Sequence, residues 1–247
     1  MCGRTLLGHA IFAARGLAPD HIAVVVRHER DRVAAHAAEC DPGITIADQD
    51  EIKGTGRALW CGLRALPADL SGPVVVTAGD TPLLSADVLS RLLGRHEGNA
   101  VTVLTAVVPD PTGYGRIVRD AEGAVAGVVE HKDATREQRE IAEINTSTYV
   151  FDADFLREAV GGLDTENAQG EMYLTDVVAK AYESGAGVGS YVVEDSWLVE
   201  GCNDLVQLAA LREQMNRRTL EAWMRAGAAI VDPATTSIDV TVTLAPD

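Results

Sequence analysis

The chain has 247 residues, of which 47% are hydrophobic and 23% are charged. This composition excludes a disordered protein, and the length fits one large domain or one domain with an appendage. The 37 acidic residues outnumber the 21 basic ones, and the formal net charge of -16 excludes a protein that binds nucleic acid non-specifically, because such a chain repels polyphosphate backbones.

The first half of the chain alternates between two apolar patterns. Apolar residues recur at helical spacing from Leu6 to Ala14, whereas short β-branched runs such as "IAVVV" indicate strands. Helices are expected at 5–17, 29–39, 54–66 and from the N-cap Ser85 onward, and strands at 22–26, 44–47, 73–78 and 100–108. Strands that alternate with helices of this length predict βαβ units, and hence a parallel sheet wrapped by helices.

The second half follows a different pattern. Residues 115–132 indicate two strands joined by a turn at Asp120–Gly123, and another strand opens near Asn145. Helices are expected at 135–143, 152–161, 174–184 and 203–226, and short alternating β segments at 228–247. A doubly wound domain usually begins with a strand, whereas this chain begins in a helix, so we expect both of its ends to be cut.

The cysteines and the hydropathy indicate the setting of the protein. None of Cys2, Cys40, Cys61 and Cys202 forms a CxxC pair or lies near a histidine at metal-ligand spacing, so reduced structural thiols are expected. No apolar run approaches the roughly 18 residues that a membrane span needs, and the N-terminus lacks the layout of a signal peptide. The sequence therefore predicts a soluble, cytoplasmic protein with no membrane partner.

Polar residues follow several of the expected strands, where ligands gather in parallel α/β sheets. These candidates are Gln49, Gly54, Thr55, Asp80, Gly115, Glu130 and Asn145. Each has a plain alternative when taken singly: Asp80 suits a turn before Thr81, the glycines suit a permissive helix entry, and Glu130 suits a solvated turn. For Asp80 alone, the turn is the favoured interpretation.

The order of five longer strings is more specific than any single residue. The strings are "GDTPLL" (79–84), "PDPTGYGRIV" (109–118), "VVEHKDATREQREIAEINTSTYVF" (128–151), "ENAQGEMYLTDVVAKAYESG" (166–185) and "VEGCNDLVQLAALREQMNRR" (199–218). With these strings the chain closely resembles the uridylyltransferase domain of the bacterial bifunctional N-acetylglucosamine-1-phosphate uridyltransferase/glucosamine-1-phosphate acetyltransferase family, in a version similar to the actinobacterial one. The resemblance covers nearly the whole chain.

The resemblance implies a fold and an activity. The fold is α/β, a Rossmann-like nucleotide-diphospho-sugar transferase (GT-A-like) mixed sheet with helices on both faces and without its first strand. Residues 1–226 would form this nucleotidyltransferase domain, and residues 227–247 a linker with the first partial coil of a left-handed β-helix. The implied reaction makes UDP-N-acetylglucosamine and pyrophosphate from UTP and N-acetylglucosamine 1-phosphate, a step of cell-wall peptidoglycan precursor synthesis.

The resemblance also assigns roles to residues at matching positions. Asp80 and Asn203 would hold Mg²⁺, a cation that takes oxygen ligands and is completed by substrate phosphates. The implied nucleotide-binding residues are Gln49, Gly54, Thr55, Ala78, Gly79 and Asp80, with Gln49 at the uracil edge. The implied sugar-binding residues are Gly115, Glu130, Asn145 and Asn203, with Tyr173 and Thr175 as further positions. No catalytic side chain is implied, because the attacking sugar phosphate is already an anion.

The sequence departs from the family at both ends. The family's first strand and its glycine-rich loop with arginine and lysine are not present, so we expect a truncated or mis-started reading frame, weak uridine-nucleotide binding and little or no turnover. The acetyltransferase site and most trimer contacts of the family lie in the β-helix, so neither activity nor stable trimers of that kind are expected. Smaller departures fall at Arg57, Ser147, Cys202 and Asp204.

Two alternatives remain open at this point. One is a catalytically dead remnant that survives as a binding or scaffold fragment. The other is a nucleotidyltransferase that takes a different sugar or base.

Overall fold

The computed structural model describes residues 1–245. The helices are α1 (Leu6–Arg15), α2 (Arg30–Cys40), α3 (Thr55–Ala65), α4 (Ala86–Gly94), α5 (Arg136–Arg139), α6 (Ala153–Gly161), α7 (Asp176–Ser184), the 3₁₀ helix η1 (Ser196–Val199) and α8 (Leu205–Arg225). The strands are β1 (Ala23–Val26), β2 (Thr45–Asp48), β3 (Pro73–Val76), β4 (Val101–Val107), β5 (Arg116–Arg119), β6 (Val125–Val129), β7 (Glu143–Asp152) and β8 (Val188–Val193).

The strands form two sheets. β1 and β2 pair in parallel as a separate two-stranded sheet. The other six strands form a mixed sheet of order β6-β5-β7-β4-β8, in which β3 also pairs with β7. β7 is antiparallel to β3, β4 and β5, whereas β4 and β8 are parallel. The mixed sheet of the implied fold is therefore confirmed, and the all-parallel sheet suggested by the alternating pattern is wrong.

β7 runs in the same direction as β6, the strand that precedes it, because both are antiparallel to β5, which lies between them. The connection over residues 130–142 contains the one helical turn α5 and is long enough for such a parallel crossover. β5 runs in the same direction as β4, so a β7 strand placed between them is antiparallel to both. The helix expected at 135–143 is reduced to Arg136–Arg139, because Glu143 already pairs with Val107 as the first residue of β7.

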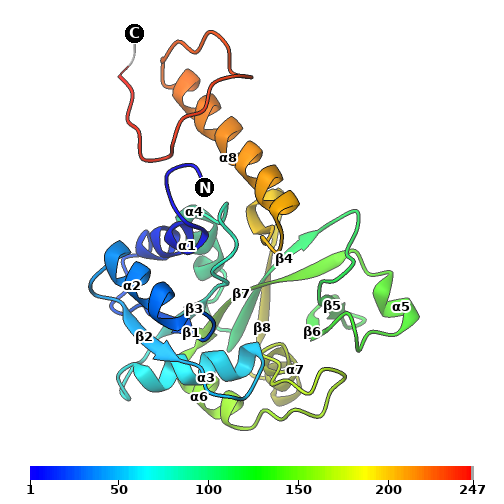
Figure 1. Ribbon diagram of the computed structural model, residues 1–247. Coiled ribbons are helices and arrows are strands. Elements are labelled where there is room, and N and C mark those ends of the chain that lie inside the picture. The colour runs from blue at the N-terminus through cyan, green and yellow to red at the C-terminus, as the bar shows by residue number, and fades with distance from the viewer. Residues whose placement is uncertain (246–247) are drawn as a thin grey trace.

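Each face of the six-stranded sheet buries its own apolar cluster under helices (Figure 1). Val101 and Phe151 face a cluster that α6 and α7 cover and that side chains of α3 extend. Leu104 and Val150 belong to the other cluster, which α4 and part of α1 cover. Alternate residues of one strand point to opposite faces, which is why β4 and β7 read as continuous apolar runs.

The chain after β7 differs from the expectations in two places. β8 was not among the expected strands, although it ends in an apolar pair, Val192 and Val193, and pairs with β4 from Val101 to Ala106. Residues 228–245 contain turns and no strand, so the short β segments expected there do not form in the described part, and positions 246–247 lie outside it. This segment instead returns to the N-terminus, where the Val240 N–H donates to the Cys2 carbonyl at 3.0 Å. That it begins a β-helix stays a prediction.

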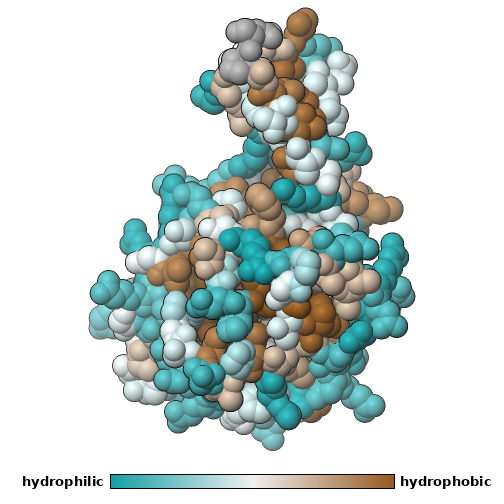
Figure 2. All heavy atoms as spheres, turned by 90° about the vertical axis from the view of Figure 1, so that its left-hand side faces the viewer, coloured by the Kyte–Doolittle hydropathy of each residue, from teal (hydrophilic) through white to brown (hydrophobic). Residues whose placement is uncertain are grey.

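The long C-terminal helix stands apart from the body of the molecule. α8 projects outward and carries the C-terminal segment beside it, as the space-filling view also shows (Figures 1 and 2). Asn216 of α8 holds that segment, since its side chain donates to the Thr236 carbonyl at 2.9 Å and accepts from the Ile238 N–H at 3.1 Å. None of the helices in residues 1–245 combines the length and the apolar character that crossing a bilayer demands.

The N-cap of α6 offers a test of local stability. The Asp152 carboxylate accepts from the backbone N–H groups of Asp154 at 3.1 Å and Phe155 at 2.9 Å. We expect Asp152→Ala to lower the free energy of unfolding by about 1–2 kcal/mol in urea denaturation, because two donors at the helix start lose their acceptor. The matched control is Asp154→Ala, which removes an exposed carboxylate from the same helical turn. If both variants lowered the free energy of unfolding by the same amount, the N-cap hydrogen bonds of Asp152 would not add to the stability of the protein.

Candidate active site

One edge of β7 brings distant parts of the chain together. β3 runs antiparallel along β7 from Asp152 to Tyr149, so the carboxyl end of β3 points toward Asn145. β5 begins at the other end of the same edge, where the Asn145 N–H donates to the Gly115 carbonyl at 2.9 Å. The loop after β3, which carries Asp80, and the loop before β5, which carries Gly115, therefore lie along one edge.

Asp80 lies against the segment that precedes α8. The Cys202 N–H donates to the Asp80 carbonyl at 3.0 Å, and a Cβ placed on Gly201 would lie 3.5 Å from the Asp80 carboxylate. Asn203 follows directly, exposed, with its own N–H bound to the Gln207 side chain at 2.7 Å. Asp80 and Cys202, which are separated by almost half of the chain, thus meet through their backbones.

The Asp80 carboxylate is half-buried without a cationic partner. Burial raises the pKa of the Asp80 carboxyl above its usual value. Across residues 1–245 no arginine, lysine or histidine forms an ion pair with it. A buried carboxylate of this kind is unfavourable unless a charge compensates it. A carboxylate oxygen and an amide oxygen, such as the Asn203 side chain carries, are of the chemical type that Mg²⁺ takes as ligands.

Tyr114 connects the Asp80 region to the Gly115 loop. Its hydroxyl donates to the Glu200 carboxylate at 3.0 Å. Burial, with the neighbouring carboxylates of Glu200 and Asp80, raises the pKa of Tyr114 to about 12, so this hydroxyl keeps its proton at neutral pH.

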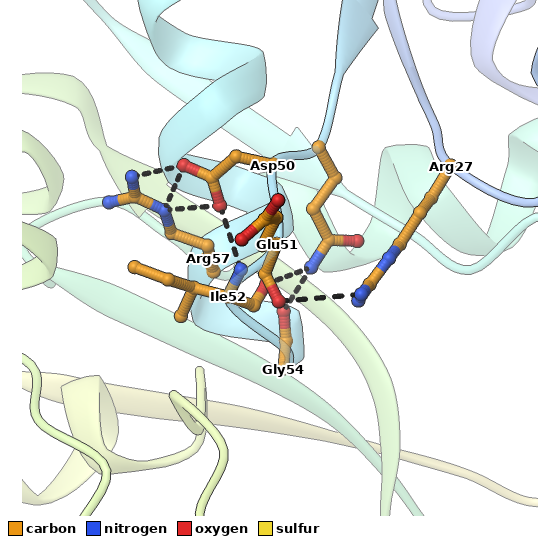
Figure 3. A network of polar contacts seen from close by, with 7 residues as sticks. Arg27, Asp50, Glu51, Ile52, Gly54 and Arg57 are labelled. Atoms are coloured by element: carbon orange, nitrogen blue, oxygen red, sulfur yellow. Dashed lines mark hydrogen bonds and ion pairs between the residues drawn. The ribbon is translucent and has the colours of Figure 1, made fainter.

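The loop after β2 orients Gln49. Its backbone N–H donates to the Val26 carbonyl of β1 at 2.9 Å, and its side-chain amide donates to the carbonyls of Ile52 at 3.0 Å and Gly54 at 3.2 Å (Figure 3). Both amide hydrogens are engaged in the loop, which leaves the amide oxygen of Gln49 as the group available to a ligand.

The entry to α3 is held against the segment before α7. The Gly56 N–H donates to the Met172 carbonyl at 2.9 Å, and the Thr55 hydroxyl accepts from the Leu174 N–H at 3.2 Å. Gly54 has φ +114, and a Cβ placed on it would lie 2.2 Å from the Met172 carbonyl oxygen. Glycine is therefore required at 54 by both conformation and contact.

A third group of residues surrounds Gly115. A Cβ placed on Gly115 would lie 3.5 Å from the Glu130 carboxylate and 3.5 Å from Asn145 Cβ. Because glycine has no Cβ, the space between the Glu130 and Asn145 side chains is not filled by residue 115. The Thr175 hydroxyl donates to the Glu130 carboxylate at 3.2 Å, and the Asn145 amide donates to the Tyr149 hydroxyl at 2.7 Å. These residues come from four elements, and the structure places them in one polar cluster.

Glu130 and Tyr173 give the Gly115 cluster its electrostatic character. Burial raises the pKa of the Glu130 carboxyl, and nearby Asp133 adds to this shift, whereas the bond from Thr175 opposes it. The Tyr173 hydroxyl donates to the Asp133 carboxylate at 3.1 Å. The cluster therefore presents hydrogen-bond acceptors, as a neutral ligand with several hydroxyl or N–H groups would need.

The remaining candidates, Ala78 and Gly79, form the start of the turn into Asp80. The Thr81 hydroxyl donates to the Ala78 carbonyl at 3.3 Å, and Gly79 lies near Leu7 of α1. The candidate residues thus form three groups: the Gln49–Thr55 loop, the Asp80–Asn203 region and the Gly115 cluster. Met172 and Tyr173 join the first group to the third, and Tyr114 joins the second to the third.

Comparison with known families decides where this arrangement belongs. The family described as a MobA-like NTP transferase domain matches residues 1–142, more than half of the chain. The chain belongs to the MobA-like NTP transferase family.

This NTP transferase is similar over almost its whole length to curated proteins of actinobacteria. It is 58% identical to "Bifunctional protein GlmU" of Pseudarthrobacter chlorophenolicus, with 99% of this chain and 51% of the relative covered. It is 55% identical to the protein of the same name from Kineococcus radiotolerans, with 99% and 50% covered. The chain spans about half the length of the curated relatives it matches. The resemblance stated from the sequence motifs is confirmed.

Solved structures support the fold of this NTP transferase. A nucleoside-diphosphate-sugar pyrophosphorylase from Vibrio cholerae superimposes with a TM-score of 0.64 at 17% identity, over 85% of this chain and 87% of that one. A 4-diphosphocytidyl-2C-methyl-D-erythritol synthase from Anaerococcus prevotii superimposes with a TM-score of 0.61 at 13% identity, over 86% of both chains. The Rossmann-like, GT-A-like fold class is therefore confirmed.

Two residues of this NTP transferase that support the site were not found from the sequence. Arg57 pairs with Asp50 through several guanidinium contacts, and so braces the loop of Gln49 rather than facing solvent alone (Figure 3). Arg116 is 1% exposed, and its guanidinium donates to the Tyr114 carbonyl, which fixes the loop before β5. An arginine inside an apolar strand was the signal for Arg116, whereas nothing local distinguishes Arg57 from a solvent-facing helix residue.

Proposed function

We propose that this chain is a uridylyltransferase domain whose site is built for uridylyl transfer from UTP to N-acetylglucosamine 1-phosphate, a reaction that gives UDP-N-acetylglucosamine and pyrophosphate for cell-wall precursor synthesis. Membership of the NTP transferase family and the relatives named above support nucleotide and sugar-phosphate substrates. A cytoplasmic setting, in which UTP is available, is part of the proposal.

The observation that carries the proposal is that contacts between distant segments join the three groups. Gly56, at the entry to α3, bonds to Met172, and the next residue, Tyr173, bonds to Asp133 beside the Gly115 cluster. Tyr114, next to Gly115, bonds to Glu200, close to the Cys202 N–H that donates to the Asp80 carbonyl at 3.0 Å. A nucleotide sugar also has three parts, a base, phosphates and a sugar, and we assign one group of residues to each part.

The residues of the site would mainly position the reactants. The phosphate oxygen of the sugar phosphate attacks the α-phosphorus of UTP, and pyrophosphate leaves from the opposite side. That oxygen is already an anion near neutral pH, so no side chain has to accept a proton. The contribution of the protein is then orientation and charge compensation.

Each group has a stated task in this mechanism. The Gln49 amide oxygen accepts from the N3–H of uracil, since its amide hydrogens are held by Ile52 and Gly54. The Glu130 carboxylate, buried beside Thr175, accepts from sugar hydroxyls. Asp80 and Asn203 would hold Mg²⁺, which when bound supplies positive charge next to the phosphates.

Ligand selectivity tests this function without requiring turnover. Isothermal titration of the chain in MgCl₂ is expected to show UDP-N-acetylglucosamine binding about tenfold more tightly than UDP-glucose, because one lost hydrogen bond in a buried site costs on the order of 1–3 kcal/mol. GDP-mannose should give no binding, since it offers neither uracil nor the acetamido group. Equal affinity for all three would contradict the assignment.

A pair of variants separates base recognition from sugar recognition. Gln49→Ala should weaken UMP and UDP-N-acetylglucosamine by the same factor, because the uracil contact is common to both ligands. Gln214→Ala, on α8 away from the loop, is the matched control and should leave both affinities unchanged. A loss confined to the sugar-containing ligand would place Gln49 elsewhere in the site.

One observation also fits a uridylyltransferase that takes a sugar other than N-acetylglucosamine. Glu130 and Asn145 accept or donate to many hydroxylated ligands, so the cluster by itself does not name the acetamido group. If UDP-glucose bound as tightly as UDP-N-acetylglucosamine while Gln49→Ala still weakened both, a uridylyltransferase with a different sugar would be the better conclusion.

A further inference from the structure

A second cluster of reactive side chains lies between α1 and α2. These helices contribute none of the candidate nucleotide or sugar residues. A cavity of about 550 Å³ opens there, lined among others by Arg4, Thr5, His36 and Cys40. Figure 2 views the molecule from the side on which α1 and α2 lie, and polar and apolar residues are interspersed on that face.

His36 is the centre of this cluster. Its Nε2 lies 2.6 Å from the Thr5 hydroxyl and 3.5 Å from the Cys40 sulfur, and its Nδ1 lies 3.5 Å from the Glu39 carboxylate. A carboxylate beside Nδ1 favours the tautomer with the proton on Nδ1, so that the single lone pair of Nε2 faces both the Thr5 hydroxyl and the Cys40 thiol. The Thr5 hydroxyl lies closer, so Nε2 can accept the thiol proton only when the Thr5 hydrogen turns away from it. The Thr5 oxygen keeps its bond from the Gly8 N–H at 2.9 Å in either case.

The Cys40 thiol is accessible, and the other thiols are less so. Cys40 is exposed, whereas Cys2 is buried and Cys61 and Cys202 are half-buried. Gly8 packs near the sulfur, because a Cβ there would lie 3.7 Å from Cys40 Sγ, an ordinary van der Waals contact.

The charges around the cavity favour an anionic reagent. The Arg4 guanidinium lies 3.8 Å from the centre of the Phe12 ring and forms no ion pair with any residue in the described range 1–245. Arg15 is paired with Asp41, and Glu39 lies on the Nδ1 side of the imidazole. On a chain of net charge -16, a cation without an ion pair in the lining of the cavity that also holds the Cys40 thiol is a local exception.

We propose that Cys40 is a modification site at which a small disulfide bearing carboxylate groups forms a mixed disulfide with the protein. The thiol proton passes to His36 Nε2, and the Cys40 thiolate attacks one sulfur of the reagent. A new S–S bond forms as the old one breaks, and the departing thiolate takes the proton from His36. The incoming disulfide is the oxidant, so the exchange balances without another reactant.

Two disulfide reagents that differ in charge test the proposal on the full chain. The anionic reagent 5,5′-dithiobis(2-nitrobenzoate) is compared with neutral 4,4′-dithiodipyridine, and the modified cysteine is located by peptide mass. We expect Cys40 to react first with both. Arg4→Gln should slow the anionic reagent about threefold, as expected for the loss of one steering charge, and leave the neutral one unchanged.

The role of His36 is tested by the pH profile. His36→Gln should slow both reagents roughly tenfold or more at pH 7, because the general base is lost, with rates that converge on the parent value at pH 10. His21→Gln, another exposed histidine, is the matched control and should react as the parent does. Faster reaction of Cys61 or Cys202, or an unchanged pH profile in His36→Gln, would overturn the proposal. If that variant fails to fold, the charge selectivity lost in Arg4→Gln decides the matter instead.

Discussion

Replacing Asp80 with asparagine is expected to remove the Mg²⁺-dependent part of uridine-nucleotide binding. Even the outer partners of a metal site typically contribute 10–100-fold to metal affinity, so the loss of a direct ligand should weaken UDP-N-acetylglucosamine in MgCl₂ by roughly a hundredfold. In EDTA the parent and the variant should bind this ligand alike. Isothermal titration in the two buffers measures both expectations.

The same substitution should stabilise the protein when no metal is added. The folded-state pKa of the Asp80 carboxyl is raised by burial, so the folded state holds the proton more tightly than the unfolded state does. The free energy of unfolding therefore falls as pH rises from about 3.9, the unfolded value, through the folded pKa. Asp80→Asn removes the decrease in the free energy of unfolding that comes from ionising this carboxyl. The Tm of the variant in EDTA should therefore exceed that of the parent at pH 7, and the two Tm values should converge at low pH.

The control for Asp80 is an exposed carboxylate that precedes β3, whereas Asp80 follows that strand. Asp69→Asn changes the net charge by the same amount outside the site, and should alter neither the Mg²⁺ dependence nor the pH dependence of the Tm. If Asp80→Asn kept full Mg²⁺-dependent binding, the assignment of the metal position would be wrong.

Gly54→Ala is expected to have the largest effect on stability. A Cβ at this position would lie 2.2 Å from the Met172 carbonyl oxygen, on a backbone with φ +114. The conformational strain and the steric clash are each worth about 1–3 kcal/mol, so a combined loss of about 2–5 kcal/mol is expected in urea denaturation. Uridine-nucleotide binding should weaken as well, because the Gly54 carbonyl helps to hold the Gln49 amide.

A second glycine separates strain from the clash. Gly72 has φ +82, and a Cβ there would meet nothing within 4 Å. Gly72→Ala should therefore show only the conformational part, about 1 kcal/mol, with nucleotide binding unchanged. If Gly54→Ala and Gly72→Ala lowered the free energy of unfolding by the same amount, the contact between Gly54 and Met172 would not contribute to the loss.

The elements that were predicted well from the sequence are those whose apolar spacing and capping residue both lie within the element or next to it. α8 covers Leu205–Arg225 against the expected 203–226, and α4 begins directly after the N-cap Ser85. Apolar spacing and a capping side chain lie within a few residues of each other, so neither depends on the rest of the fold. β8 was missed because its short apolar run resembles a loop until β4 is known to lie beside it.

The site residues divide in the same way. Gln49, Asp80, Glu130 and Asn145 could be named because each lies at the end or the start of a strand-like run, and the family motifs then gave each of them a role. Their contacts could not be predicted: Thr175 bonds to Glu130 across 45 positions, and Leu174 bonds to Thr55 across 119. Such pairs carry no local pattern, because the contact exists only after the sheet has brought the two segments together.

The sequence by itself determined the family, the class of fold and the identity of the chemical groups, because these depend on residue types and their order along the chain. Only the tertiary structure decided that β7 runs antiparallel to its neighbours, and that the segment before α8 returns to Asp80. The physical reason is that strand direction and long-range contacts depend on how the chain buries both faces of the sheet. Because this burial involves the whole packed core, it cannot be predicted from a short stretch of neighbouring residues.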